Sequence, residues 1–210
     1  MNRDGASPGS PSDEDLLARL QRGQREWFGE LVRRYERELY SYLWRYLGDA
    51  ELAADVFQNT CVAIFKKIKY YERGRAAKPW IYTVATNQAI DAMRQRARRR
   101  EQVLPYAADG DDDRGETFFE QVPQIGPGPE EHAEVSEQHQ RLRDALNVLN
   151  SSQRQVIVLT YFQGLKYQEA AEVLGIPLGT VKSRLNGAMA KLTAVWHEQN
   201  QPQDEAGQPT

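Results

Sequence analysis

The stretch from Leu142 to Leu192 constrains the fold most, because two helical patterns meet there at one tight turn. Small and apolar residues recur at helical spacing across 168–174. Gly175 follows them, where a helix commonly ends in a left-handed residue. Pro177 then restarts the chain, since proline lacks the amide hydrogen that a first helical residue leaves unpaired. The pattern predicts two helices that cross sharply, as in a helix-turn-helix.

The second of these helices is predicted to have two different sides. Its apolar side, which suits a core, consists of Val181, Leu185, Ala188, Met189 and Leu192. The other side consists of Thr180, Ser183, Arg184, Gly187 and Lys191. A helix of this kind can enter a DNA major groove, where Lys182 and Arg184 can reach phosphates. The same spacing also suits an ordinary helical hairpin inside an all-α protein, and the spacing alone leaves that alternative open.

The flanking residues favour the DNA-binding interpretation. The sequences YFQGLKYQEAAEVLG, GIPLG and TVKSRLNGAMAKL closely resemble region 4 of bacterial RNA polymerase sigma factors of the extracytoplasmic-function (ECF) group. In that family the second helix reads the minus-35 promoter element. The resemblance therefore implies that this element is contacted by Thr180, Lys182, Ser183, Arg184, Asn186 and Gly187. Relatives commonly carry arginines where Gly187 and Met189 stand, so we expect base reading to shift to Ser183, Arg184 and Asn186.

Length and composition set outer limits. A chain of 210 residues can form two small domains, and its 40% apolar content is enough for their cores. Its one cysteine, Cys61, has no partner for a disulfide or a zinc site, which favours a reducing, cytoplasmic setting. We expect no membrane helix and no signal peptide, because the longest apolar runs are short.

The first half of the chain predicts two helices and a polar surface. Helical spacing indicates one long helix from Asp13 to about Gly48, and Asp49 is placed to cap a second helix. From 26 to 100 the chain is similar to sigma region 2. In that family the second helix binds the clamp helices of the polymerase largest subunit, which implies that core polymerase is bound by Asp55, Gln58 and Asn59. Asn59 departs from the acidic residue common in the family.

Residues 66–100 are strongly basic. Eleven lysines and arginines oppose two acids, a net charge of +9, and tyrosines are interleaved among them. Cations that follow phosphates and rings that stack on bases suit single-stranded nucleic acid. For Trp80 we favour a place in the core of a third helix.

The sequence PWIYTVATNQAIDAMRQ resembles the part of these factors that melts promoter DNA and captures a flipped base of the minus-ten element. The loop from Tyr71 to Lys78 corresponds to the specificity loop. The resemblance implies that the minus-ten DNA is bound by Tyr71, Arg75, Lys78, Asn87, Arg94 and Arg98. Relatives usually have arginines where Thr83 and Thr86 stand, so we expect the arginine run to supply more of the phosphate grip.

Residues 101–140 reverse the charge, with eleven acids against Arg114, a net charge of −10. GPGP within this stretch breaks regular structure, so we predict a flexible acidic linker. The DGDDD cluster lacks the ligand spacing of a calcium loop, and the three histidines form no ligand set. We therefore expect no metal, no cofactor and no catalytic residues.

The sequence thus predicts an all-α protein of two small helical domains joined by the acidic linker. We expect a disordered tail over 1–12, a region 2 bundle of three or four helices over 13–100, the linker over 101–136, a region 4 helix-turn-helix domain over 137–197 and a second tail over 198–210.

The resemblance implies a sigma factor that binds core RNA polymerase and promoter DNA, both as duplex and as melted strand. It allows an anti-sigma factor as a further partner. A stand-alone helix-turn-helix regulator is the alternative, although it leaves the basic segment without a role. An enzyme is less favoured, because no nucleophile elbow or phosphate loop is present.

Overall fold

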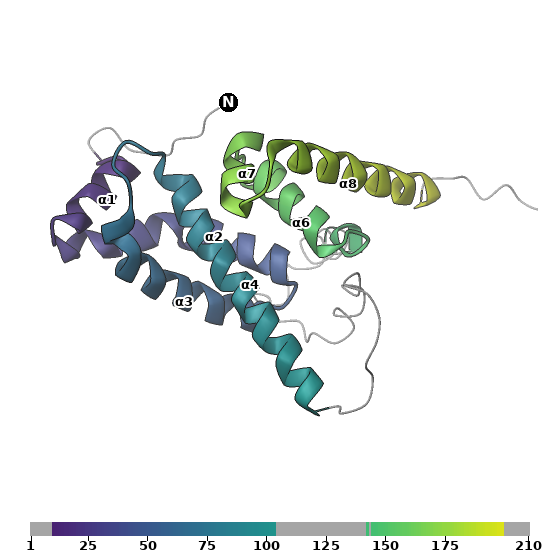
Figure 1. The fold of residues 1–210 in the computed structure, drawn as a ribbon, viewed down its shortest axis with the longest axis horizontal. Coiled ribbons are helices and arrows are strands. Elements are labelled where there is room, and N and C mark those ends of the chain that lie inside the picture. The colour runs from purple at the N-terminus through teal and green to yellow at the C-terminus, as the bar shows by residue number, and fades with distance from the viewer. Residues whose placement is uncertain (1–9, 104–141, 143, 200–210) are drawn as a thin grey trace, which may run out of the picture.

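In the computed structural model, residues 10–103, 142 and 144–199 are described, and they form helices and turns without a strand. The first part contains α1 (Asp13–Gln21), α2 (Phe28–Leu47), α3 (Ala50–Lys67) and α4 (Ala77–Val103). The second contains α6 (Ser151–Ile157), α7 (Tyr167–Leu174) and α8 (Leu178–Gln199). We refer to residues 10–103 as the first module and to residues 142–199 as the second (Figure 1). The expectation of an all-α fold is confirmed, and the expected linker lies outside the described residues.

The predicted long first helix is wrong, because the chain breaks between α1 and α2. Gly23 adopts a left-handed φ of 86°, and a short 3-10 turn, Arg25–Trp27, leads into α2. The Gln21 side-chain amide donates hydrogen bonds to the carbonyls of Ile68 (3.0 Å) and Tyr71 (2.6 Å). The break therefore lets α1 fold back and tie itself to the segment that follows α3.

The core of the first module lies between α2, α3 and α4, which pack against one another. Tyr42, Val56 and Ile81 are among the side chains fully buried there. Tyr42 meets Tyr82 edge to face, with ring centroids 5.2 Å apart, and its hydroxyl is 2.7 Å from that of Thr86. Aromatic rings with paired hydroxyls thus fill the centre of the bundle.

The expected capping of α3 by Asp49 is confirmed. The Asp49 carboxylate accepts a hydrogen bond from the Leu52 amide (3.0 Å) and forms an ion pair with Arg96 (2.6 Å). Partial burial acts to raise the Asp49 pKa, but these partners outweigh it and hold the pKa below its usual value. The start of α3 is thereby fixed to the C-terminal third of α4.

In the second module, α6 is capped by Asn150. The Asn150 side chain accepts from the Gln153 amide (2.9 Å), and the Gln153 side chain accepts in return from the Asn150 amide (3.3 Å). A π-helical turn, Val158–Phe162, follows α6. The predicted end of α7 at Gly175 is confirmed, with a left-handed φ of 62°.

Helix α8 begins at Leu178, one residue after the expected start. The Pro177 carbonyl accepts hydrogen bonds from the amides of Thr180 (2.9 Å) and Val181 (3.2 Å). Val181, Leu185 and Ala188 are buried, as the apolar side of the helix predicts. Met189, which was expected on that side, is instead 42% exposed, because it lies at the edge of the buried stripe.

The two modules are in contact. Helix α7 packs on α4, and α6 and the π-helical turn pack on α2, so the second module lies alongside the first (Figure 1). The Tyr82 hydroxyl donates to the Gln163 side chain (2.6 Å), and the Gln155 amide donates to the Tyr46 hydroxyl. The Arg45 guanidinium lies 4.9 Å from the centre of the Phe162 ring. Within the described ranges, no helix is both long and apolar enough to cross a membrane.

Candidate polymerase- and DNA-binding surfaces

The candidate polymerase-binding residues lie together on one face of α3. Asp55, Gln58 and Asn59 are all exposed, while Val56 and Thr60 point into the core on the opposite side. One turn further along this face, Val62 is 52% exposed. The helix therefore presents a polar stripe that ends in an apolar residue, a composition suited to contact with another protein.

The loop that follows α3 holds Tyr71 inside the fold. Its ring is only 4% exposed and packs edge to face on Trp80, with centroids 5.3 Å apart. Its hydroxyl donates to the carbonyl of Arg75 within the same loop. Tyr71 thus presents no stacking face in this conformation, whereas the neighbouring Tyr70 is 69% exposed. Tyr70 belongs to the interleaved aromatic pattern of the sequence, but that pattern alone does not show which ring faces outward.

The other candidates for minus-ten binding are exposed or half-buried. Asn87, Arg94 and Arg98 are exposed and follow one face of α4 at intervals of seven and four residues. Arg94 is 3.9 Å from Asp91, a loose pair that leaves its guanidinium exposed. At the start of the helix, Lys78 is half-buried and pairs with Glu38 across the fold (3.3 Å).

Arg75 is exposed in the loop ahead of α4, where it pairs with Glu72 (2.8 Å). Both residues of this pair are largely exposed, so solvent and salt weaken the interaction. Exchanging Glu72 for a phosphate as the partner of the Arg75 guanidinium therefore costs little free energy. The basic candidates are spread along α4, from Arg75 before its start to Arg98 near its end, and together they make up the basic surface of the first module.

The two threonines that replace family arginines have structural roles. Thr86 is fully buried, where its hydroxyl meets both that of Tyr42 and the carbonyl of Tyr82. The Thr83 hydroxyl donates to the Pro79 carbonyl (2.9 Å). An arginine at Thr86 would need a solvent path that this packing does not leave. Residue 86 thus contributes to the core and not to the basic surface.

On α8, the candidate residues for minus-35 binding lie on the side of the helix that faces away from the core. Lys182, Ser183 and Asn186 are exposed; Thr180, Arg184 and Gly187 are half-buried. The Ser183 hydroxyl donates to the Thr180 carbonyl (3.0 Å). Its oxygen lone pairs therefore remain available to a donor outside the helix. All six residues lie within the first three turns, the part of a recognition helix that enters a groove.

Sequence reasoning missed the residues that join the modules. Gln155 and Gln163 are buried, although polar side chains in a helical pattern are usually assigned to solvent. Burial, aided by the nearby charge of Glu38, raises the pKa of Tyr82, so its phenol stays protonated and serves as the donor to Gln163. No local signal marks these glutamines, because their partners are 81 and 109 residues away in the chain.

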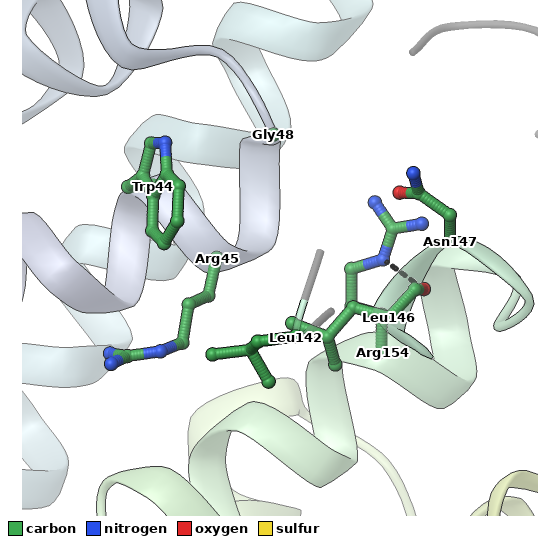
Figure 2. Close-up of a pocket in the computed structure, with 7 residues that line it drawn as sticks. All are labelled: Trp44, Arg45, Gly48, Leu142, Leu146, Asn147 and Arg154. Carbon is green, nitrogen blue, oxygen red and sulfur yellow. Dashed lines mark hydrogen bonds between the residues drawn. The ribbon is translucent and has the colours of Figure 1, made fainter. Parts of the chain in front are cut away.

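A small cavity lies at this junction. Figure 2 shows its lining, which includes Trp44 and Arg45 from α2 and Leu146 and Arg154 from the second module. The Arg154 guanidinium donates to the carbonyls of Leu146 (3.1 Å) and Leu149 (3.3 Å). These carbonyls, at the end of the preceding helical turn, thereby gain hydrogen-bond donors. Burial lowers the pKa of Arg154 to about 10, so it remains charged at neutral pH. With a volume of about 10 Å³, the cavity holds no more than a water molecule.

Comparison with known proteins agrees with this arrangement. Residues 31–99 match the family model for sigma-70 region 2, and residues 139–192 match that for sigma-70 region 4. RNA polymerase sigma factor CnrH of Cupriavidus metallidurans is 32% identical over 89% of this chain and 96% of its own length. ECF RNA polymerase sigma factor SigE of Mycolicibacterium smegmatis is 31% identical over 78% of this chain, which spans 59% of that protein.

The fold is also similar to a solved structure of CnrH in complex with the cytosolic domain of CnrY. The TM-score is 0.65 at 25% identity, with 90% of this chain and 99% of that chain covered. The fold and the two family matches together define a helical, two-module protein of transcription initiation. The chain belongs to the sigma-70 family of RNA polymerase sigma factors, in the ECF group. The alternative of a stand-alone helix-turn-helix regulator is not favoured, because it does not account for region 2.

Proposed function

We propose that this chain directs core RNA polymerase to promoters by reading a minus-ten element with its first module and a minus-35 element with its second. One observation carries the proposal: a single chain holds both sigma regions, and each exposes a polar helix face that its own core does not use. The chain itself supplies binding and positioning, and the polymerase supplies the chemistry. It would act in the cytoplasm, where the polymerase is.

The face of α3 is the proposed contact with core polymerase. Asp55, Gln58 and Asn59 supply hydrogen-bonding groups there, and Val62 adds exposed apolar area to the same stripe. Because Val56 and Thr60 on the opposite side hold the helix in the core, the stripe is presented on a rigid element.

For the minus-ten element, the exposed stripe on α4 supports a role for Asn87, Arg94 and Arg98. Arg94 and Arg98 would pair with phosphates, and the Asn87 amide, two turns earlier on the same face, would read a base. Flipping a base costs a few kcal/mol, and a surface that binds the extruded base lowers the barrier to melting. We assign Tyr71 to the support of the loop, and the exposed ring of Tyr70 is better placed to stack on DNA.

For the minus-35 element, α8 would lie in the major groove. Arg184 can donate to guanine, and Asn186 can pair with adenine. Lys182 and the amides at the start of α8 would hold phosphates.

The chain cannot bind the two promoter elements at the same time while its modules are packed together. By their names the two elements lie about 25 base pairs apart, which is roughly 85 Å along B-DNA at about 3.4 Å per pair. In the structure α7 packs on both α4 and α8, and packed helix axes are about 10 Å apart, so the axes of α4 and α8 come within about 20 Å of each other where they meet α7. Duplex DNA of this length is too stiff to bend until elements about 85 Å apart could reach two helices about 20 Å apart. We infer that the modules separate when the promoter is bound.

The proposal is tested most simply at the polymerase contact. We expect the double variant Asp55→Ala, Gln58→Ala to weaken retention of the chain by immobilised core polymerase about tenfold or more, in line with the loss of central interface residues. Arg33→Ala, which removes an exposed residue on α2, is the control and should be retained normally. Full retention of the double variant would contradict the proposed contact.

A further inference from the structure

Gly187 occupies an unusual place on α8. A Cβ atom added to it would lie 2.9 Å from the side-chain nitrogen Nε2 of Gln153 on α6. At Gly179, on the same helix, an added Cβ would meet nothing within 4 Å. The space that a side chain at 187 would fill is therefore already taken by an amide from the neighbouring helix.

The orientation of that amide is fixed by the cap of α6. The Gln153 oxygen Oε1 accepts from the Asn150 amide (3.3 Å), and the Gln153 backbone amide donates to the Asn150 side chain (2.9 Å). With Oε1 turned toward Asn150, Nε2 faces α8. Within the described part of the chain, neither Nε2 hydrogen is donated to an acceptor, and the Gln153 side chain is only half-buried. Two oriented donors are thus held at the surface of the recognition helix.

We propose that Gln153 is a DNA-contacting residue of the second module, with its amide supplying the hydrogen-bond donor that a side chain at 187 would otherwise supply. The proposal rests on the function given above, since it requires α8 to face DNA. The recognised chemistry is an acceptor on the DNA, either a base-edge nitrogen or oxygen in the groove or a phosphate oxygen. Gly187 has a positioning role, because any side chain there would displace the amide.

The variant Gln153→Glu separates this role from capping. Glutamate keeps the acceptor that the Asn150 amide needs, so the cap of α6 survives. It loses both donors and places a negative charge beside the DNA. Gly187→Ala is the converse variant, since its new Cβ pushes the amide away while Gln153 itself remains.

The test measures binding of the full chain, assembled with core polymerase, to a duplex selected from a randomised DNA pool by the unaltered protein. We expect Gln153→Ala and Gly187→Ala each to weaken binding about 2- to 10-fold, the range of one hydrogen bond. Gln153→Glu should weaken it further, and the double variant Gln153→Ala, Gly187→Ala no further than either single change. Gly179→Ala is the control for Gly187→Ala, because its new Cβ displaces no neighbour. Comparing the melting temperatures of the two variants shows how much of the change at 187 is an effect on stability.

Repeating the selection with Gln153→Ala identifies the acceptor. A preference lost at one base position indicates a base edge, and a uniform loss with a shallower salt dependence indicates a phosphate. If Gln153→Glu bound as tightly as the unaltered chain, or if the two single losses simply added, the inference would be overturned. Arg184→Ala separates failure of this inference from failure of the proposed function. If Arg184→Ala also left binding unchanged, the placement of α8 on DNA would be wrong, and not only the role of Gln153.

Discussion

Helices α4 and α8 both carry a proposed DNA face, but they are built into the molecule in different ways. Helix α8 buries Val181, Leu185 and Ala188 and leaves its polar side open. Helix α4 also has an open stripe, but its buried side includes Tyr82, which bonds to the second module, and it packs against α7. The comparison shows that α4 joins the minus-ten surface to the contact between modules, while the reading side of α8 stays clear of it.

The largest expected difference between the helices is in stability. Tyr82→Ala removes a fully buried ring that packs on Tyr42, so we expect a loss of about 3–5 kcal/mol in the free energy of unfolding. Asn186→Ala, on the exposed side of α8, should change it by no more than about 0.5 kcal/mol. Urea denaturation measures both. Similar losses for the two variants would remove the distinction drawn here.

The next largest effect is expected for DNA binding by the exposed side of α8. We expect Arg184→Ala to weaken binding to the minus-35 duplex by about 1–3 kcal/mol, through the loss of a charged donor at the groove. Arg33→Ala removes the same charge from an exposed position on α2, away from the proposed surface, and should leave affinity unchanged. A titration by fluorescence anisotropy compares them. Equal losses would show that only net charge matters.

Removing a single hydroxyl group tests the link between α4 and the contact between the modules. Tyr82→Phe leaves the buried Gln163 oxygen without its donor only while the modules are packed, so we expect separation to become easier by about 1 kcal/mol, roughly fivefold. Energy transfer between a dye on each module reports this shift. Tyr42→Phe is the matched control, because its hydroxyl bonds to Thr86 inside the first module. If both variants shifted the transfer equally, the Tyr82–Gln163 bond would have no special part in closure.

The smallest expected effect concerns the anchoring of α4 to α3. Because the Asp49 pKa is lowered in the folded state, its contribution to stability is present above the ordinary value of about 3.9 and is lost as pH falls through the folded-state pKa. Arg96→Ala should cost less than about 1 kcal/mol at neutral pH, since the pair is partly exposed. Unfolding from pH 7 to pH 2 should show this cost shrinking below pH 4. A cost that did not change with pH would exclude the ion pair as its source.

Features with a local cause were predictable from the sequence. Gly175 ends α7 because glycine tolerates a left-handed residue, and Asp49 caps α3 because a short carboxylate can reach the next turn. The break at Gly23 was missed because apolar spacing continues on both sides of it. Its cause is distant: the Gln21 amide bonds to carbonyls 47 and 50 residues away.

The candidate surfaces were predictable in part, for the same reason. Helical spacing and family resemblance placed Asp55, Gln58, Asn87 and Lys182, which are exposed in the structure. They could not show that Tyr71 is buried or that Gln163 meets Tyr82, because both depend on packing between segments far apart in the chain. The roles of these residues in binding stay predictions.

The central claim is most directly tested by transcription in vitro. Purified core polymerase, with and without this chain, would be given a pool of genomic DNA fragments, and the starts of the run-off transcripts would be mapped. We predict that the chain concentrates initiation at sites that share two short elements at a fixed separation, and that the Asp55→Ala, Gln58→Ala variant loses this selectivity. Initiation no more selective with the chain than without it would contradict the claim.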